Sequence, residues 1–525
     1  MLRASEALNS KSAFLDVALL LLLFTLTILA IHGLGFVSDD FFLLVGNLKL
    51  PLTESGDELH RPLRNMFLRL AGSLLGVRHV WPYRVLVAGS FVAVLAVLYQ
   101  FMRRLGAGRS GARAAVLIMA FFPRNQEVLF WFAAWQDLVA GLCVLLAALC
   151  FVDFRESKRT RSLMLAAGAY AVALGFKETT VVIPFLLLLV DFYRERSLLS
   201  FRKLAFWRAY FPFAGILLLY VAYFLSESGG ASLTGHKTGG FYGFHGLFGL
   251  LAGVIRALIN IGLPFVTPVP VGLANVSLRY VAILFVELAV LLWLVWRIKA
   301  WPALILALGW MVVTILPTAA FAAMFNADRY LFVPFIGAAM LAGLLVDGLG
   351  RWRPEARYSA LVWIALAIYC VAGGALMAEY RRVWQRGGEE ALLVAHGTVE
   401  AASGLPPGSE VDLVNVTRFL TPYIVSVFSN GLADALAGNG LPASIRVIGN
   451  FAQPSPEQRS LMTKLEACTD RSAEVSGTTR IVLVTVNHRL VQARTACAAP
   501  LIDADRAEHP KAWSSLDSVP TPPGY

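Results

Sequence analysis

The stretch AFLDVALLLLLFTLTILAIHGL, residues 13–34, decides the fold class of this chain. It has the length and apolar composition of a helix that crosses a membrane. It is too long for the apolar core of a signal peptide, and no small-residue cleavage site follows it. The same character runs through the chain, because 58% of the 525 residues are hydrophobic, 15% are charged and the mean hydropathy is +0.66. We therefore expect a polytopic α-helical membrane protein with a retained first span.

Clusters of Lys and Arg set the expected topology, because basic residues concentrate in the cytoplasmic loops of membrane proteins. All clusters fall on the cytoplasmic side if the N-terminus is cytoplasmic and about eleven helices span the membrane. These spans are expected near 13–34, 83–102, 112–123, 129–152, 162–176, 179–193, 208–225, 278–296, 301–318, 330–349 and 358–378. The net charge of +11 then reflects loop bias rather than nucleic-acid binding. The apolar segment 246–264 is expected to be re-entrant or to lie on the membrane surface.

The composition changes after about residue 380, where turn-rich stretches such as SGLPPGS and QPSPEQ separate short β-like runs. An odd number of spans places this part outside. We expect a transmembrane domain over 1–380, with external loop helices at about 39–80, and a small extracytoplasmic α/β domain over 381–525. Cys468 and Cys497 would face an oxidising compartment there, and a disulfide between them is preferred to two free thiols.

Asp39 and Asp40 directly follow the first span, where a charge can still be hydrated. Two carboxylates at a membrane face bind a cation, accept a proton or pair with nearby bases, and the alternative is a solvated loop end. The same loop holds His60 and Arg61, and an amphipathic stretch over 63–74 is expected to lie in the headgroup layer. Cations beside carboxylates are typical of a pocket that handles both a phosphate and a proton.

Three further outside turns carry polar residues at the membrane edge. They contain Glu127 followed by Asp137, the pair Lys177 and Glu178, and the run Asp328, Arg329 and Tyr330. An acid within a span, such as Asp137, must be paired or face a cavity. Lys177 either forms a salt bridge with its neighbour or is presented to a lipid phosphate. Arg329 suits bidentate phosphate recognition, and the alternative is an interfacial anchor formed with the tyrosine beside it.

Four stretches in this order resemble the GT-C superfamily of membrane glycosyltransferases. The closest likeness is to the protein O-mannosyltransferase group, including its TPR-bearing members and their bacterial relatives. The stretches are Ser38-Asp39-Asp40 with Gly46-Asn47 and Arg61-Pro62-Leu63, then Pro123-Arg124-Asn125-Gln126-Glu127-Val128 with Asp137, then Gly175-Phe176-Lys177-Glu178-Thr179, and Asp328-Arg329-Tyr330-Leu331 with Pro334. The last has Asp where the family has Glu. The likeness covers about residues 10–380. The chain departs in reading Phe122-Pro123 where relatives often have His-Pro, and in lacking the TPR array.

The resemblance implies an inverting glycosyltransferase that moves a sugar from a polyprenyl-phosphate-linked donor to an acceptor on the outer face of the membrane. Asp39 or Asp40 would be the base that takes the proton of the acceptor hydroxyl. The residues that would stabilise the departing lipid phosphate are Lys177 and Arg329, followed by His60 and Arg61. Supporting or acceptor-contacting roles fall to Glu127, Asp137, Glu178, Asp328 and Tyr330.

The expected partners are the lipid-linked donor, membrane lipid and a glycan, lipid or protein acceptor of the cell envelope, without nucleic acid. The sequence contains no P-loop, CxxC or HExxH motif, so no cofactor is expected. A divalent cation, Mg²⁺ or Mn²⁺, at Asp39 and Asp40 stays open. The Ala- and Arg-rich, Lys-poor composition is typical of a GC-rich bacterium, which favours an inner-membrane location with a periplasmic active site and an undecaprenyl carrier.

Two other functions are consistent with parts of this pattern. A transporter or flippase of lipid or polysaccharide precursors would need polar residues at mid-bilayer and paired broken helices in two similar halves. The acids gather at one face instead, and no half-to-half repeat is evident in the sequence. The second alternative is a catalytically silent membrane scaffold whose external domain binds a partner.

Overall fold

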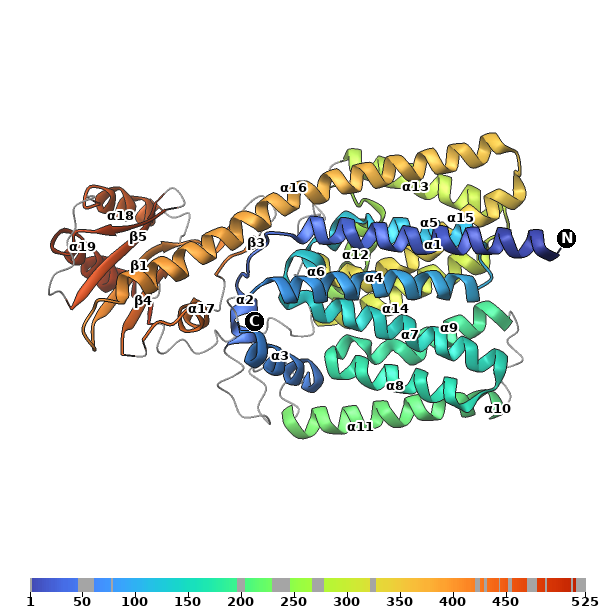
Figure 1. Ribbon diagram of the computed structural model, residues 1–525, viewed down its shortest axis with the longest axis horizontal. Helices are drawn as coiled ribbons and strands as arrows, with labels where there is room; N and C mark the ends of the chain where they lie inside the picture. The colour runs from blue at the N-terminus through green and yellow to red at the C-terminus, as the bar shows by residue number, and fades with distance from the viewer. Residues whose placement is uncertain are drawn as a thin grey trace.

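The computed structural model describes residues 2–45, 61–76, 79–195, 204–228, 246–266, 278–321, 327–420, 425–428, 432–442, 444–451, 456–469, 479–486, 489–510 and 513–515. Most of these residues form long helices that run roughly side by side in one bundle. The strands of the main sheet gather beyond one end of that bundle (Figure 1). Along its long axis, the molecule therefore consists of a helical part followed by a part that contains the sheet.

The bundle is built from the longer helices in the described part of the chain. They are α1 (Leu2–Ile31), α4 (Trp81–Arg104), α5 (Arg109–Ala120), α7 (Trp135–Ser157), α8 (Thr160–Phe176), α9 (Ile183–Glu195), α11 (Phe211–Ser228), α12 (Gly246–Gly262), α13 (Leu278–Arg297), α14 (Trp301–Phe321), α15 (Phe332–Trp352) and α16 (Ala356–Ala402). Short helices and 3₁₀ turns connect them. These are α2 (Asp39–Leu44), α3 (Pro62–Leu75), η2 (Pro123–Asn125), α6 (Gln126–Phe130), η3 (Phe132–Ala134), η4 (Glu178–Val182), α10 (Leu204–Trp207), η6 (Arg208–Tyr210) and η9 (Asp328–Leu331).

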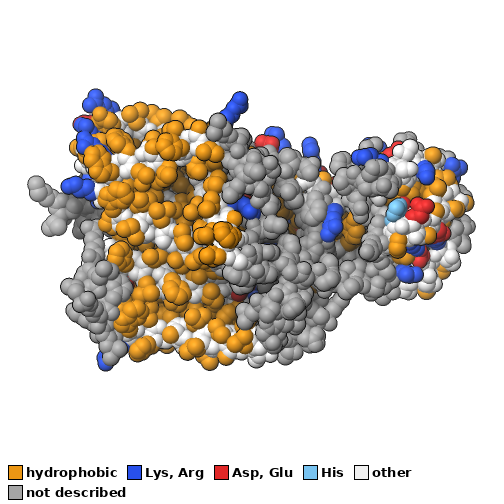
Figure 2. All heavy atoms as spheres, turned by 180° about the vertical axis from the view of Figure 1, so that it is seen from behind, with side chains coloured by type: hydrophobic (Ala, Val, Ile, Leu, Met, Phe, Trp, Pro, Cys, Tyr) orange, Lys and Arg blue, Asp and Glu red, His pale blue; other side chains and the backbone are white. Residues whose placement is uncertain are grey.

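The outer surface of the bundle is apolar. Leucines of α1 such as Leu21, Leu22 and Leu29 are more than half exposed, which water would not favour but lipid would. Apolar side chains form a broad band over the bundle, and Lys and Arg side chains gather at the edge of the band farthest from the sheet (Figure 2). This distribution is expected of helices that cross a membrane with their basic loops on the cytoplasmic side.

Seven described helical segments are long and apolar enough to cross a membrane, judged by length and composition. They are Ala13–Ile31, Trp81–Arg104, Phe132–Ser157, Arg208–Ser226, Trp301–Ala319, Asp328–Trp352 and Ala356–Ala402. The apolar helices Thr160–Phe176 and Gly246–Gly262 fall short of the roughly 20 residues that a span needs. The expected count of about eleven spans stays a prediction.

Helix α16 connects the two parts of the molecule. It is 47 residues long, more than twice the roughly 20 residues that cross a bilayer, so its second half extends beyond the bundle (Figure 1). Buried residues of this second half, including Ala391, Val394 and Ala395, belong to the same hydrophobic core as Val411 and Leu413 of the sheet. The helix is therefore both a predicted span and one layer of the C-terminal fold.

The C-terminal sheet has five strands in the order β6-β5-β1-β4-β7. Its strands are β1 (Glu410–Val416), β4 (Arg446–Phe451), β5 (Arg480–Val486), β6 (Arg489–Ala493) and β7 (Trp513–Ser515). The central strand β1 is parallel to β4 and β5, while β6 and β7 pair antiparallel at the two edges. A separate antiparallel pair is formed by β2 (Phe419–Leu420) and β3 (Val425–Ser426). The helices of this part are α17 (Leu432–Gly438), α18 (Pro456–Glu466) and α19 (Thr495–Glu508).

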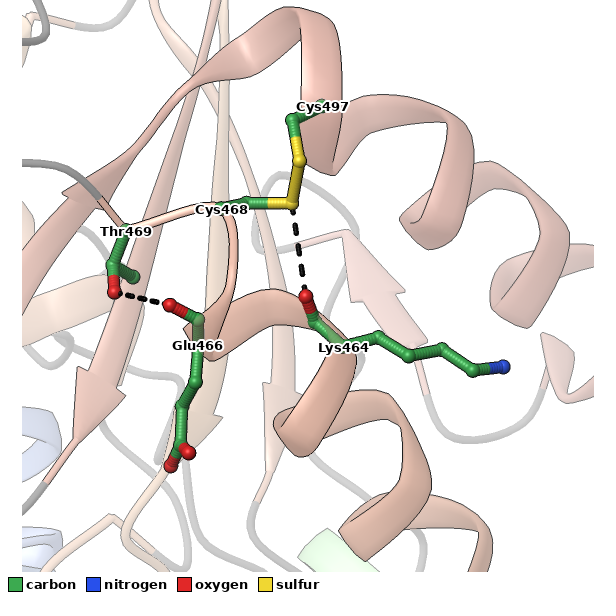
Figure 3. Close-up of a disulfide and its surroundings, with 5 residues drawn as sticks. All are labelled: Lys464, Glu466, Cys468, Thr469 and Cys497. Carbon is green, nitrogen blue, oxygen red and sulfur yellow. Dashed lines mark hydrogen bonds between the residues drawn. A yellow bond between two sulfur atoms is a disulfide. The ribbon is translucent and has the colours of Figure 1, made fainter.

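The two faces of the sheet pack against different helices, because successive side chains of a strand point to opposite sides. Val414 and Val484 face a second core that contains Leu465 of α18 and Ile502 of α19. A disulfide joins Cys468, just beyond α18, to Cys497 in α19 (Figure 3). This is the cysteine pair that was expected from the sequence.

The parallel strands point back toward the helical bundle. Thr417, directly after β1, hydrogen-bonds the Glu390 carboxylate in the middle of the α16 extension, whereas β1 begins soon after α16 ends at Ala402. Strand β1 therefore runs antiparallel to α16. The C-terminal ends of the parallel strands are consequently on the side of the sheet nearest the bundle.

Candidate active site

The predicted acid pair opens the short helix α2, at the end of the bundle that is nearest the sheet (Figure 1). Asp40 is fully buried. Its carboxylate oxygens accept hydrogen bonds from the backbone N–H groups of Val37 (3.1 Å) and Ala133 (2.6 Å). Asp39 is partly exposed. The two neighbouring acids are therefore in different environments: Asp40 is fully buried, whereas Asp39 is partly exposed, with its Oδ1 atom buried.

Arg84 of α4 supports the acid segment from within the bundle. Its guanidinium donates to the carbonyl oxygens of Leu34 (3.3 Å), Gly35 (2.6 Å) and Phe130 (2.8 Å), and it is only 1% exposed. Burial raises the pKa of Asp40 to about 7, and the positive charge of Arg84 opposes this rise. Sequence reasoning missed Arg84, although an arginine inside a predicted span is itself a signal of function.

Arg61 and Glu178 join α3 to η4. The Arg61 guanidinium binds the Glu178 carboxylate through Nε (2.6 Å) and Nη2 (2.8 Å), and it also donates to Gln136 Oε1 at 2.9 Å. Arg64 donates to the same Gln136 oxygen at 3.2 Å. Burial alone would raise the pKa of Glu178, but the Arg61 charge and its hydrogen bonds outweigh burial and lower this pKa to about 2. The pair is ionised throughout the physiological range.

The amphipathic helix α3 turns its apolar side outward. Met66, Leu70 and Leu74 are all more than half exposed, whereas Arg64 and Asn65 are buried. A helix at a lipid interface is expected to place its apolar face toward the lipid in this way. The arrangement agrees with the predicted headgroup-layer helix and delivers its polar face to the candidate site.

Lys177 and Asp137 form a buried ion pair between η4 and the first turn of α7. The Lys177 ammonium also lies 5.0 Å from the centre of the Tyr330 ring. The second Asp137 oxygen, Oδ2, is buried and has no hydrogen-bond partner among the described residues. Asp137 is thus paired, as an acid within a span must be, and it fixes the position of the lysine.

Arg329 also contacts the Tyr330 ring. Its guanidinium carbon is 4.9 Å from the centre of the Tyr330 ring and 4.8 Å from that of Trp131. Its backbone N–H donates to Glu127 Oε2 at 3.1 Å, and its Nη1 lies 3.5 Å from the same oxygen. Burial raises the pKa of Glu127, and the charge of Arg329 opposes the rise. Two cations, Lys177 and Arg329, therefore share one tyrosine ring.

Asp328 has a different partner from its neighbour Arg329. It binds Arg124 Nη1 at 2.9 Å and Gln126 Nε2 at 3.1 Å. Arg124 also donates to the carbonyl oxygens of Asn260 and Val266, and Trp384 of α16 hydrogen-bonds Gln126. This cluster joins η9 to η2, α6, α12 and α16. Its members are almost fully buried, so it holds the turns in place rather than facing a ligand.

These contacts bring most of the predicted site residues into one region. Gln136 and Asp137 are adjacent, as are Lys177 and Glu178, so the two ion pairs are neighbours. Ala133, which binds Asp40, precedes Gln136 in the same turn of chain. His60 lies outside the described residues, as do Gly46 and Asn47. Arg84, Arg124 and Trp384 are additions that the sequence motifs did not identify as site residues.

A divalent cation at the acid pair fits these contacts poorly. Both carboxylate oxygens of Asp40 accept hydrogen bonds from backbone N–H groups, and the nearby charge is the Arg84 guanidinium. Hydrogen bonds to both oxygens and a guanidinium close by make this carboxylate a weaker ligand for a divalent cation. Within the described ranges, no group of three or more His, Cys, Asp or Glu side chains is arranged to hold a metal ion. We therefore derive no step through a metal.

Comparisons with known proteins agree with this architecture. Residues 59–224 match the family model of the dolichyl-phosphate-mannose-protein mannosyltransferases. No curated protein matches the sequence. Among solved structures, the apo crystal structure of ArnT from Cupriavidus metallidurans is similar over 93% of this chain and 98% of its own chain. Its sequence identity is 13% and its TM-score is 0.52.

Two further solved structures are similar at lower scores. Arabinofuranosyltransferase AftD from Mycobacteria has 16% identity and a TM-score of 0.48, over 94% of this chain and 38% of its own. The oligosaccharyltransferase AglB from Archaeoglobus fulgidus, in complex with an inhibitory peptide and a dolichol-phosphate, has 11% identity and a TM-score of 0.44. That match covers 83% of this chain and 69% of the other.

The chain is thus a multi-pass integral membrane protein with the fold of ArnT. Together with the mannosyltransferase family match, this fold confirms the resemblance to the GT-C superfamily of membrane glycosyltransferases that the four sequence motifs indicated.

Proposed function

We propose that this protein is a glycosyltransferase that moves one sugar from a polyprenyl-phosphate-linked donor to an acceptor hydroxyl, with inversion at the anomeric carbon. The observation that carries the proposal is the joint position of the acid pair and the cations Lys177 and Arg329. All of them lie at one end of an apolar bundle. Lys177 and Arg329 contact the same Tyr330 ring, and Asp40 is bound by Ala133, which is close in the chain to Asp137, the partner of Lys177. This combination suits a reaction between a lipid phosphate and a hydroxyl group.

The chemistry needs a base and an anion site. The acceptor oxygen attacks the anomeric carbon and forms the new glycosidic bond. The bond from that carbon to the phosphate oxygen breaks, and its electron pair leaves with the lipid phosphate. The acceptor proton passes to a carboxylate of the protein. Inversion follows from a single displacement of this kind.

Asp39 is our candidate for the base. It is the partly exposed carboxylate of the pair, whereas both oxygens of Asp40 are engaged by backbone N–H groups inside the protein. A base must reach the proton that it removes. Asp40 is better suited to hold the turn in which Asp39 lies.

Arg329 and Lys177 are our candidates for binding the donor phosphate. The Arg329 side chain is 14% exposed, against 4% for that of Lys177 and 1% for that of Arg124. A guanidinium at the protein surface can bind phosphate oxygens in bidentate fashion. Lys177, which contacts the same Tyr330 ring, would add a second positive charge. Glu127 and Asp137 would orient these two cations, and the Arg61–Glu178 pair would hold α3 against them.

The proposed topology has eleven spans, a cytoplasmic N-terminus, and the site and the C-terminal domain on the periplasmic side of a bacterial inner membrane. The basic edge of the bundle, opposite the sheet, supports this orientation (Figure 2). The donor lipid would lie between spans, with a cell-envelope glycan, lipid or protein as acceptor.

The test is a transfer assay with purified protein in lipid nanodiscs. Radiolabelled polyprenyl-phosphate sugars would be supplied as donors, with membrane extract as the source of acceptors. We expect the wild type to transfer label from the lipid to an acceptor. The rate of this transfer should fall by at least about 100-fold with Asp39→Asn, because general base catalysis contributes about 10²–10⁴ in rate.

Glu156→Gln is the matched control, because Glu156 pairs with Arg104 and Arg194 near the opposite end of the bundle. It should transfer sugar at the wild-type rate. A flippase would be favoured by two results together. No lipid-linked sugar tested would be transferred, and the lipid would move across the bilayer of vesicles.

A further inference from the structure

The segment that carries the acid pair lies between the bundle and the C-terminal part of the chain. On one side, Arg84 and Ala133 bind it. On the other side, the contacts come from residues that follow the last predicted span. Arg381 of α16 donates to the carbonyl oxygen of His32 (2.8 Å), and α17 packs against α2.

The backbone of Ser38 is strained at the residue before Asp39. Its φ of 44° is in the left-handed region, which a residue with a side chain seldom adopts, and its ψ is −114°. Such a conformation persists only where the surroundings fix it. The fixing contact is a hydrogen bond from the Ser38 N–H to the carbonyl oxygen of Val427, directly after β3, at 2.8 Å.

Two packing contacts accompany this hydrogen bond. Phe41 of α2 stacks on Phe428, with ring centres 6.3 Å apart and planes inclined by 23°, and both rings are buried. Gly35 touches Gly388 of α16 backbone to backbone. A Cβ atom added to Gly388 would lie 2.8 Å from both the nitrogen and the Cα of Gly35, which is closer than real Cβ contacts.

We propose that residues 425–428 and the extension of α16 position the acid pair, so that the C-terminal part of the chain completes the active site. Val427 and Phe428 hold Ser38 and Phe41, and Gly388 sets how closely α16 approaches the segment. These are positioning residues, which act on the reaction through Asp39. The inference rests on the proposed glycosyltransfer, because it assigns a role to the same carboxylates.

Positioning of the acid pair is a different role for the C-terminal part than docking of the acceptor. A docking surface would present exposed polar groups, and its loss would raise the KM for the acceptor. The contacts described here are buried and made to the protein's own acid segment. Their loss should lower kcat, because a displacement of about 1 Å at a reacting group can cost about 100-fold in rate.

Gly388→Ala is the first test, with Gly374→Ala as the matched control on the same helix. A Cβ at Gly374 would meet only Phe121 ring atoms, at 3.7 Å and 3.8 Å, which is ordinary contact. Alanine in place of glycine favours a helix, so loss of helix stability would not explain a loss of activity. We expect Gly388→Ala to lower kcat about 10- to 100-fold with the KM for donor and acceptor within about threefold. Gly374→Ala should keep the wild-type kcat.

A second set of three variants tests the aromatic contact. Phe428→Ala should lower kcat in the same way, Phe428→Tyr should restore most of it, and Trp513→Ala, in the core on the far face of the sheet, should not change kcat of the folded fraction. Wild-type kcat in both Gly388→Ala and Phe428→Ala would overturn the proposal. So would a raised acceptor KM at unchanged kcat, which would indicate docking.

Hydrogen exchange of the peptide over 36–44 gives a readout that does not depend on activity. We expect faster exchange of these amides in Gly388→Ala and Phe428→Ala than in the wild type and in Gly374→Ala. The wild type could transfer no sugar while this peptide still lost protection in Gly388→Ala and Phe428→Ala. That result would contradict the proposed function but support the positioning contact. Unchanged protection in an active enzyme would remove the positioning role.

Discussion

Adjacent residues of the candidate site differ in the environment that the fold gives them. Asp39 is partly exposed and Asp40 is buried, although they are neighbours in α2. Arg329 stacks on aromatic rings near the surface, whereas Asp328 is held inside by Arg124. We propose that in each pair the more exposed residue meets the ligand and its buried neighbour anchors the turn. The chemistry of each residue type alone does not distinguish the two roles.

The Arg61–Glu178 pair leads to a prediction about acid stability. The folded protein lowers the pKa of Glu178 from 4.5 to about 2, so the unfolded chain takes up a proton first as the pH falls. The contribution of this pair is therefore complete above about pH 4.5 and is lost between there and pH 2. We expect Glu178→Gln to lower the free energy of unfolding by about 3 kcal/mol at pH 7, because it leaves the buried Arg61 guanidinium without the carboxylate that balances its charge.

The measurement is the thermal unfolding midpoint in detergent at a series of pH values from 7 to 2. The difference in unfolding midpoint between wild type and Glu178→Gln should become smaller as the pH falls below 4.5. Glu156→Gln, which removes a more exposed ion pair, should shift the midpoint little, because surface pairs contribute less than about 1 kcal/mol. A constant gap down to pH 2 would contradict the role assigned to the Arg61–Glu178 pair.

Single-residue chemistry could be predicted from the sequence only in part. The acids and cations of the four motifs were identified by type and order, and the contacts link them. Their partners could not be predicted, because Arg61 and Glu178 are 117 positions apart and meet only through helix packing. Arg84 was predictable in principle as an arginine within a span, but the carbonyl groups that it binds depend on how the irregular segment before α2 is folded.

At the scale of elements, short turns rather than long helices position the site. The turns η3, η4 and η9 each begin or precede a bundle helix, and each contributes a backbone or side-chain contact to the cluster. Their 3₁₀ geometry gives no periodic signal in the sequence. Polar turns were predicted at the positions of η4 and η9 but not their conformation, and η3 lies within the span expected near 129–152. The helices provide rigid ends at fixed separations, and the turns direct polar groups toward one another.

The disulfide between α18 and α19 supports a second prediction at this scale. Cys468 and Cys497 are 29 positions apart, and closing a loop of this length stabilises a fold by about 2–4 kcal/mol. We expect the double variant Cys468→Ser/Cys497→Ser to unfold at lower temperature than the wild type. A reducing agent should lower the wild-type midpoint and leave that of the variant unchanged.

Cys370→Ser is the control, because Cys370 is a free thiol in the part of α16 that is predicted to span the membrane. It should retain the full response to the reducing agent. The wild-type unfolding midpoint could stay unchanged even though the disulfide is shown to be reduced. This disulfide would then not stabilise the C-terminal fold.

Over the whole molecule, the two parts of the chain meet at the acid pair. Hydropathy and the positive-inside rule predicted the apolar bundle and its basic edge, because both depend on local composition. The turn-rich composition after residue 380 predicted strands and helices, but not where they would lie. The contact between Val427 and Ser38 joins segments from nearly opposite ends of the sequence, and no local pattern encodes it. The number of spans stays a prediction, since helices such as α5 and α9 are shorter than the membrane is thick.

The proposed role of Asp39 as the base is tested most directly by a single-turnover measurement. The protein is loaded with a radiolabelled polyprenyl-phosphate sugar before acceptor is added. Wild type and Asp39→Asn would be compared at equal amounts of bound donor, so that binding and chemistry are separated. We expect both proteins to hold the donor and only the wild type to release its sugar to the acceptor at a measurable rate, with inverted configuration. Transfer at the wild-type rate by donor-loaded Asp39→Asn would contradict the assignment of the acid pair as the centre of the reaction.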